Sequence, residues 1–246
     1  METSLHRQLK ERYAGTEARV EVPVQGYRID AVRGERLVEI QHGSLAAIRD
    51  KLRQLLVGHR VLLVKPIIRN KLLVKQNAKG GDVVSRRKSP KRGQLLDLFD
   101  ELVYFTRVFP HKNLAIDVPL VDVEEWRYPG HGRRRRHRKN DFQVEDQRLV
   151  GVRRTHRFRT AADLCRLLPK ELPSQFHTGH IADGLGIDRW IAQRMAYCLR
   201  HIGGLRQVGK EGNALLYELA TTKKPRKKPR KSSPTRRLAR VAKTGR

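Results

Sequence analysis

Two acidic residues, Asp30 and Glu39, lie in neighbouring segments that alternate apolar and polar side chains. Gln41 lies on the same strand face as Glu39, because side chains alternate along a strand. A hairpin between the segments would bring Asp30 next to Glu39. Two adjacent carboxylates repel each other unless a cation lies between them, and Mg²⁺ or Mn²⁺ prefers such hard oxygen ligands. Because such an ion activates water and stabilises charge on a phosphate, the pair predicts phosphodiester hydrolysis.

A helix is expected to precede these strands. Residues 3–14 read as helical, with Thr3 or Ser4 as the N-cap and Gly15 as the stop. At 100° per residue, Glu2 and His6 share the apolar face of this helix. They are either polar groups at the edge of a buried face or frayed residues at a helix start.

The following segments predict a three-stranded meander, a helix and a buried strand. Arg33, Gly34 and Glu35 form a tight hairpin signal between the second and third strands. The helix presents one apolar face. The expected ranges are 18–24, 26–32 and 36–41 for the meander, 44–57 for the helix and 59–67 for the buried strand.

This order of elements, with Asp30 on one strand and Glu39-Ile40-Gln41 on the next, resembles the PD-(D/E)XK nuclease superfamily over roughly residues 1–68. The resemblance implies an α/β restriction-endonuclease-like domain with an αβββαβ core. It also implies that Asp30 and Glu39 bind the metal. The residue two after the Glu is usually Lys in that family, and here it is Gln41, which would position the attacking water.

Two lysines are candidates for the missing cation, namely Lys51 in the helix and Lys65 in the buried strand. A first-helix acid often completes the site of that family, and Glu2 matches by its facing. The alternative to a metal site is a solvated face of an edge hairpin.

The rest of the first unit, residues 1–130, extends this domain. A further strand over 67–76, a basic loop over 77–94, a helix over 95–109 and an extended segment over 114–126 are expected. Pro119 lacks an N–H, so the extended segment should lie at an edge or contain a break. Its acidic residues fit an exposed strand face better than a second metal site; they are Asp117, Asp122, Glu124 and Glu125.

A basic connector over 131–157 follows, and it is expected to form a hairpin with its turn at residues 145–147. Its four consecutive arginines, Arg133, Arg134, Arg135 and Arg136, are expected to pair with phosphates.

Residues 158–222 predict three helices and a two-stranded hairpin, a pattern that resembles the winged helix-turn-helix fold, a small α+β domain. The resemblance implies that the third helix enters the DNA major groove. An interaction with another protein is the alternative. The candidate contacts are Arg189, Gln193, Arg194 and Arg200, with Lys210 at the wing tip. Cys165 and Cys198 are expected to be core thiols. The two units together also resemble an uncharacterised bacterial family with a nuclease-like half and a winged helix.

The 246 residues have a net charge of +29, which predicts a polyanionic partner. Residues 223–246 hold 12 basic and no acidic residues and are expected to be disordered. Duplex DNA is the expected partner and RNA ranks lower, because aromatic residues are only 6%. The sequence has no apolar run of membrane length, so a cytoplasmic, nucleoid-associated protein is expected, with a homodimer as one candidate assembly. The hypotheses are a Mg²⁺- or Mn²⁺-dependent DNA endonuclease and a non-catalytic DNA-binding protein on a decayed nuclease scaffold.

Overall fold

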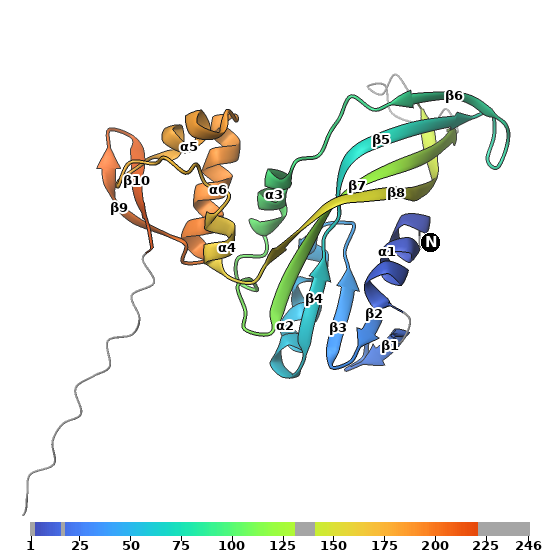
Figure 1. The fold of residues 1–246 in the computed structure, drawn as a ribbon, viewed down its shortest axis with the longest axis horizontal. Coiled ribbons are helices and arrows are strands. Elements are labelled where there is room, and N and C mark those ends of the chain that lie inside the picture. Colours follow the sequence, from blue (N-terminus) through green and yellow to red (C-terminus); the bar gives the residue numbers. More distant parts are fainter. Residues whose placement is uncertain (1–2, 16–17, 131–140, 221–246) are drawn as a thin grey trace, which may run out of the picture.

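A mixed α/β arrangement with one large sheet forms the centre of the protein in the computed structural model, which describes residues 3–15, 18–130 and 141–220 (Figure 1). Within these residues the sheet has eight strands in the order β1-β2-β3-β4-β7-β5-β6, and β8 pairs with β7. The strands are β1 (Arg19–Val24), β2 (Tyr27–Arg33), β3 (Arg36–Ile40), β4 (Arg60–Val64), β5 (Ile67–Gln76), β6 (Val83–Lys88), β7 (Leu114–Pro129) and β8 (Phe142–Phe158).

Short turns set the meander of β1, β2 and β3. Gln25 and Gly26 connect β1 to β2 with φ of 50° and 79°, and positive φ at both positions is what a type I′ hairpin turn requires. Gly34 begins the next turn with φ of 57°. β3 then pairs in parallel with β4, which is buried over all but its first residue. The predicted meander, hairpin turns and buried strand are confirmed.

Helices cover the two faces of this sheet. α1 (Ser4–Ala14) packs on one face through Leu5 and Leu9, with Thr3 as its N-cap. The 3₁₀ helix η1 (Leu45–Ile48) and α2 (Arg49–Gly58) cover the other face. The 3₁₀ helix η2 (Leu95–Asp97) and α3 (Leu98–Leu102) contribute to the same core. The predicted helix at 95–109 is shorter in the structure, since residues beyond Leu102 form turns.

The long strand β7 changes its partner halfway along its length. Leu114 to Asp117 pair with β4, and the segment from Leu120 onward pairs with β5. The buried Pro119 lies at this change, where the ladder to one neighbour has ended and the next has not begun. β7 itself continues through Pro119 without a break, and only the ladder on the β4 and β5 side is interrupted there. β7 also lies inside the sheet and not at its edge, because β8 pairs along its other side.

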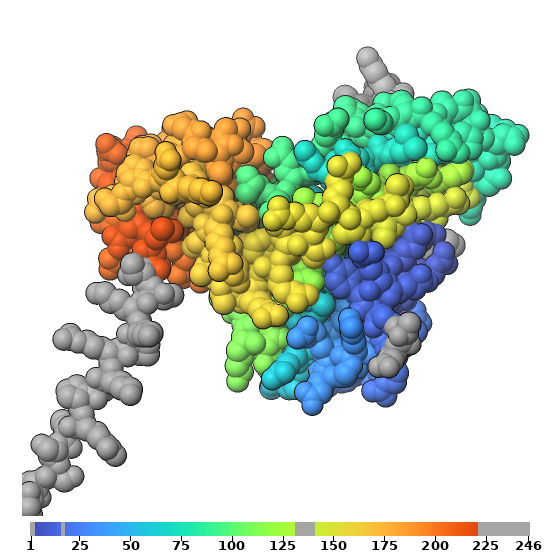
Figure 2. All heavy atoms as spheres, viewed as in Figure 1, coloured from blue at the N-terminus to red at the C-terminus, as the bar shows by residue number. Residues whose placement is uncertain are grey.

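Two expectations for the middle of the chain were wrong. Residues 83–88, expected in a loop, form the edge strand β6, which pairs with β5. Residues 142–158, expected as a hairpin, form the single strand β8, in which Gln147 pairs with Glu125 of β7. The ladder to β7 absorbs extra residues at register shifts, so no turn is needed at 145–147. Figure 2 shows β8, in yellow, lying across the front of the molecule.

The C-terminal part contains three helices followed by two antiparallel strands. They are α4 (Ala161–Cys165), α5 (Thr178–Leu185), α6 (Arg189–His201), β9 (Leu205–Glu211) and β10 (Ala214–Leu219). α6 packs against α3, and the Cys198 thiol donates to the Phe99 carbonyl oxygen at 3.6 Å. Both residues belong to one buried apolar cluster that joins this part to the sheet. The two predicted units therefore share a core.

No helix in the described part of the chain is long and apolar enough to cross a membrane. The basic tail over 223–246 and most of the first half of the connector, including Arg133, Arg134, Arg135 and Arg136, lie outside the described residues. Glu2 also lies outside them.

Candidate functional site

The β2–β3 hairpin brings Asp30 and Glu39 together. Its register pairs Val32 with Leu37 and Ala31 with Val38, and Asp30 and Glu39 are the next residues after this ladder ends. They are close enough for the negative charge of Asp30 to raise the pKa of Glu39. The Asp30 carboxylate Oδ2 accepts a hydrogen bond from the Ile40 backbone N–H at 2.7 Å. This side-chain contact closes the ladder at the carboxyl end of β3 and holds the Asp30 carboxylate beside Glu39.

Asp30 receives a second hydrogen bond from α1. His6 Nε2 lies 3.0 Å from Asp30 Oδ1. Burial alone would raise the pKa of Asp30, but the hydrogen bonds from His6 and from the Ile40 N–H lower it overall. Asp30 is therefore held as a carboxylate, with Oδ1 facing α1 and Oδ2 facing the end of β3.

Glu39 is almost completely buried and pairs with a lysine of α2. Its side chain is 8% exposed, and Lys51 Nζ lies 2.5 Å from its Oε1. Lys51 also donates to the Arg28 carbonyl oxygen at 2.8 Å, which fixes the ammonium between β2 and β3. The second oxygen, Glu39 Oε2, is buried and accepts no hydrogen bond from the described residues.

The same surroundings determine the ionisation of Glu39. Burial raises its pKa most, and the negative charge of Asp30 raises it further. The hydrogen bond from Lys51 opposes this rise without cancelling it. A second cation near the carboxylates would therefore stabilise the ionised form of Glu39.

Lys51 is the lysine that reaches the carboxylates, whereas Gln41 and Lys65 are held elsewhere. Gln41 Nε2 donates to the Ser44 carbonyl oxygen at 2.8 Å. Lys65 Nζ donates to the carbonyl oxygens of His42 and Gly43 and pairs with Glu101 at 3.1 Å. Both side chains therefore fix the segment that follows β3 and do not contact Asp30 or Glu39.

A basic extension of the sheet lies near this segment. We define the arm as β5, β6, the segment of β7 from Leu120 onward and the part of β8 that pairs with that segment. Figure 1 shows the arm beside α1. The pKa of His42 is lowered by burial first and then by the charges of Lys65 and Lys71, so the arm residue Lys71 lies near the end of β3. Lys71 pairs with the buried Glu125, which also binds Arg127 and Gln147.

The expected exposed acidic face of β7 is wrong for most of its residues. Asp117 and Glu125 are buried, and Asp122 is paired with Arg153 at 2.8 Å. Arg157 donates to both oxygens of Asp117 at 2.6 and 2.7 Å. Each of these acids has a cationic partner, so they stabilise the sheet and leave no open metal site on this strand.

Asp30 and Glu39 fit a divalent ion that is only partly held by protein. The described residues contain no group of three or more His, Cys, Asp or Glu side chains arranged for a metal. Mg²⁺ usually retains several waters and binds through one or two carboxylates plus substrate phosphates. Asp30 and the unpartnered Oε2 of Glu39 match that donor set.

The candidate DNA contacts on α6 differ from one another. Arg189 and Gln193 are exposed, and Lys210 is exposed on β9. Arg194 pairs with Asp100 of α3 and lies over the Trp190 ring, while Arg200 donates to Gln207 at 3.0 Å. Arg189, Gln193 and Lys210 are therefore the side chains of this set that reach solvent without a partner in the described residues.

Sequence reasoning missed the contact between His6 and Asp30, although it placed His6 on the correct face of α1. The available signal was the position of His6 on the apolar face of the predicted helix. It did not identify the carboxylate that the imidazole meets.

Comparison with known proteins relates the chain to sequences without an assigned activity. An uncharacterized protein of Treponema pallidum (strain Nichols) is 29% identical over 218 residues, which cover 88% of this chain and 84% of that protein. No solved structure matches the chain. Residues 3–159, which span the whole large sheet, match the domain of unknown function DUF8091. The chain belongs to the DUF8091 family.

Proposed function

We propose that this protein is a divalent-metal-dependent nuclease that hydrolyses phosphodiester bonds in DNA. The observation that supports this proposal is the juxtaposition of Asp30 and Glu39 with Lys51, where Glu39 keeps one buried oxygen without a partner. The order α1-β1-β2-β3-α2-β4 around these residues is also the order on which the resemblance to PD-(D/E)XK nucleases rests. This finer fold assignment is part of the proposal.

Asp30 and Glu39 would hold Mg²⁺ or Mn²⁺, which supplies Lewis-acid stabilisation and activation of water. His6 and the Ile40 N–H keep Asp30 ionised, since both lower its pKa. We assign to Lys51 the role first expected of Gln41, namely to orient the water and to balance negative charge beside Glu39. Lys51 can do so because its ammonium is already fixed by the Arg28 carbonyl oxygen.

The C-terminal part would bind the DNA duplex as a winged helix. Three helices followed by the β9–β10 hairpin support this assignment. Arg189 and Gln193 project from α6, and such side chains can read base edges in the major groove. Such a protein would associate with the nucleoid in the cytoplasm.

Plasmid cleavage with Mg²⁺ or Mn²⁺ tests the proposal. The variants Asp30→Asn and Glu39→Gln should abolish cleavage, and Lys51→Ala should reduce it strongly. The control is Asp50→Asn, which removes an exposed carboxylate from the same helix as Lys51. Titration calorimetry with Mn²⁺ provides a second readout, in which Asp30→Asn and Glu39→Gln should lose binding. Unchanged cleavage in both carboxylate variants would refute the nuclease assignment.

A non-catalytic DNA-binding protein is the second candidate. It is favoured by the contacts that His6 and Lys51 already make with the two carboxylates, and by the absence of a three-residue metal cluster within the described residues. In that case the protein binds DNA in a salt-sensitive manner and does not cleave it, with or without EDTA. Competition between duplex DNA and RNA of equal length separates both candidates from an RNA-binding protein.

A further inference from the structure

A row of arginines lies at the opposite end of the sheet from Asp30 and Glu39. Arg33 pairs with Arg36 across β2 and β3, and Arg36 pairs with Arg60 across β3 and β4. We call Arg33, Arg36 and Arg60 the arginine row. Registered neighbours on adjacent strands project to the same side, and all three line one groove of about 710 Å³.

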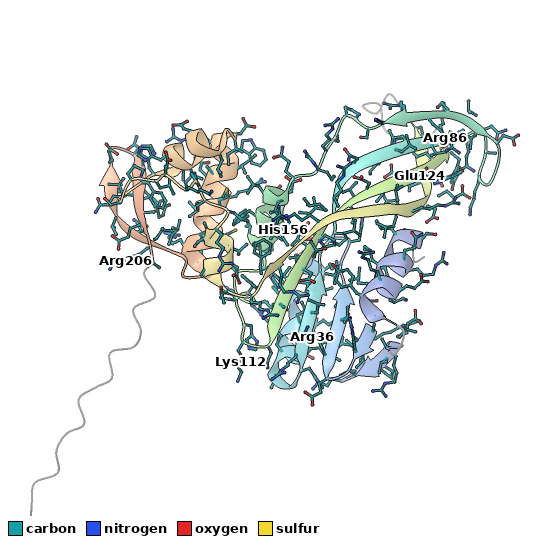
Figure 3. The ribbon with its side chains drawn as sticks, in the orientation of Figure 1. Arg36, Arg86, Lys112, Glu124, His156 and Arg206 are labelled. Atoms are coloured by element: carbon teal, nitrogen blue, oxygen red, sulfur yellow. The ribbon has the colours of Figure 1, made fainter. Side chains whose placement is uncertain are left out.

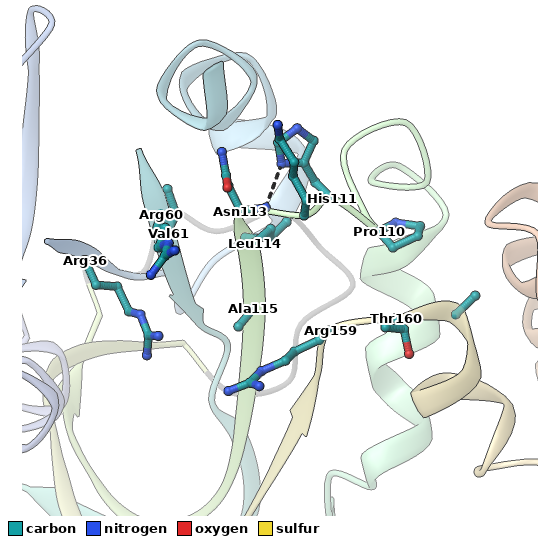
Figure 4. A pocket seen from close by; sticks show the side chains of 12 residues that line it. Arg36, Arg60, Val61, Pro110, His111, Asn113, Leu114, Ala115, Arg159 and Thr160 are labelled. Carbon is teal, nitrogen blue, oxygen red and sulfur yellow. Dashed lines mark hydrogen bonds between the residues drawn. The ribbon is translucent and has the colours of Figure 1, made fainter. Parts of the chain in front are cut away.

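The same arginines extend into a second cavity. Arg36 and Arg60 also line a space of about 610 Å³ that continues toward the start of α4. Figure 4 shows Arg159 reaching past Ala115 toward Arg36 and Arg60. Figure 3 places Arg36 and Lys112 at this end of the sheet, far from Arg86 and Glu124 in the arm. The two cavities therefore adjoin at Arg36 and Arg60, and we refer to them together as the basic groove.

The side chains of this groove are not neutralised by the fold. Arg33, Arg36, Arg60 and Arg159 have no hydrogen bond or ion pair from their side chains within the described part of the chain. The second cavity has no acidic residue among its described lining. The first groove has two acidic residues among its described lining: Asp117, which is occupied by Arg157, and Glu35, which makes no ion pair with the arginine row. Adjacent like charges on a sheet are destabilising, so an anion bound between the members of the arginine row would relieve their repulsion.

A histidine loop adds a further donor. His111 Nδ1 accepts the Asn113 backbone N–H at 3.2 Å, shown as a dashed line in Figure 4. Because a neutral imidazole accepts at one nitrogen and donates at the other, Nε2 carries the proton. Asn113 in turn donates to the Leu56 carbonyl oxygen at 3.0 Å, which fixes this loop beneath α2.

We propose that the arginine row binds the phosphodiester backbone of duplex DNA. Neighbouring strands lie about 4.8 Å apart, so three strands spread the row over roughly 10 Å. Phosphates of one DNA strand rise by about 3.4 Å each along the duplex axis, so the row can meet two or three of them. Neither groove has a Phe or Trp side chain among its described lining, and each has one other ring, His111 in the 610 Å³ cavity and the half-buried Tyr13 in the other, so there is no series of aromatic rings on which successive bases could stack. A backbone contact without base recognition fits these side chains better than a nucleotide does.

This inference shares duplex DNA as partner with the proposed function, but it does not depend on metal or on cleavage. The test therefore measures binding of a fluorescein-labelled duplex by fluorescence anisotropy, in EDTA, over a series of salt concentrations. The full chain is compared with the triple variant Arg33→Gln, Arg36→Gln and Arg60→Gln. The control variant removes the same charge from three exposed positions outside the groove, Lys79→Gln, Arg107→Gln and Lys170→Gln.

The salt dependence gives the expected result. Each lost phosphate contact should lower the slope of log affinity against log salt by roughly 0.9, so the triple variant should lose about 2 to 3 in slope relative to the control. An equal slope in the two variants overturns the proposal. A failure of the proposed metal site would change cleavage and leave the salt slope unchanged, whereas a failure of the arginine-row proposal would appear in the salt slope.

Thermal melting distinguishes the possible sources of phosphate. Without added anion, the triple variant should melt no lower than the wild type, because like-charge repulsion is removed. Duplex DNA should raise the melting temperature of the wild type more than that of the triple variant. If inorganic phosphate or ATP produces that difference and DNA does not, the groove binds a small phosphate compound and the assignment to DNA is wrong. Stronger competition by an RNA duplex would likewise overturn it.

Discussion

Replacing Lys51 by Met should destabilise the protein in a manner that depends on pH. The substitution keeps the length of the side chain and removes the ammonium 2.5 Å from Glu39 Oε1. Glu39 is 8% exposed, so an unpaired negative charge there would cost about 3–5 kcal/mol. The carboxylate can avoid part of that cost by taking up a proton.

Protonation sets an upper limit on the loss. Protonating a carboxyl group above its unfolded-state pKa of 4.5 costs about 1.36 kcal/mol per pH unit, so keeping it neutral at pH 7 costs roughly 3.4 kcal/mol. At pH 5 the same limit falls to roughly 0.7 kcal/mol. Because the folded pKa of Glu39 is raised, the folded state binds the proton more tightly, and stability is regained as the pH falls toward 4.5.

Urea unfolding followed by circular dichroism at pH 7 and pH 5 measures this difference. We expect Lys51→Met to lower the free energy of unfolding by about 3 kcal/mol at pH 7, which corresponds to roughly 6–12 °C in melting temperature. At pH 5 the loss should be about 1–2 kcal/mol, because the hydrogen bond to the Arg28 carbonyl oxygen is still missing. The double variant with Glu39→Gln should recover most of the loss at pH 7. The control Arg53→Met, on the exposed face of the same helix, should change stability by less than about 0.5 kcal/mol. An equal loss of stability at pH 7 and pH 5 would show that Lys51→Met does not leave an unpaired charge on Glu39, and would refute the reasoning.

Four further outcomes are expected. Arg157→Ala leaves Asp117 buried and unpaired and should cost about 2–3 kcal/mol in urea unfolding, less than for a fully buried pair because the Arg157 side chain is 44% exposed. Burial raises the pKa of Cys198 to about 12, so iodoacetamide at pH 8 should leave this thiol unlabelled until urea unfolds the protein. Phe99→Ala should cost about 3–5 kcal/mol and lower the melting of sheet and C-terminal helices together, as seen by circular dichroism. Hydrogen bonds lower the pKa of Glu125 despite its burial, so its stabilisation is lost as pH falls below 4.5, and Glu125→Gln should flatten the acid limb of a stability–pH curve.

The parts of the fold that local signals determine were predictable. The meander follows from two-residue turns at Gln25-Gly26 and Gly34-Glu35, and the second turn brings Asp30 near Glu39 at the far end of the hairpin. The boundaries of α1 follow from Thr3 and Gly15. In each case the residues that decide the structure lie within a few positions of it.

The parts that depend on distant partners were not predictable from pattern alone. β6 is exposed along its whole length, and only its ladder to β5 makes it a strand. β8 contains residues typical of a turn at 145–147, yet pairing with β7 outweighs their local preference. Lys51 and Lys65 were equivalent candidates from sequence, because the choice depends on which carbonyl and carboxylate oxygens each ammonium meets after folding.

Pairing, more than net charge, separates the charges that we propose to be functional from those that stabilise the sheet. Asp117, Asp122 and Glu125 are each neutralised by a cationic side chain. The arginine row has no such neutralisation in the described residues, and Glu39 keeps an unpartnered buried oxygen. Arg36 and Glu39 belong to the same strand, roughly 10 Å apart along it. Because side chains alternate along a strand, the spacing of three residues places them on opposite faces of the sheet. The arginine row and the carboxylate pair are therefore two separate proposed sites, and the metal-free binding assay and the cleavage assay test them independently.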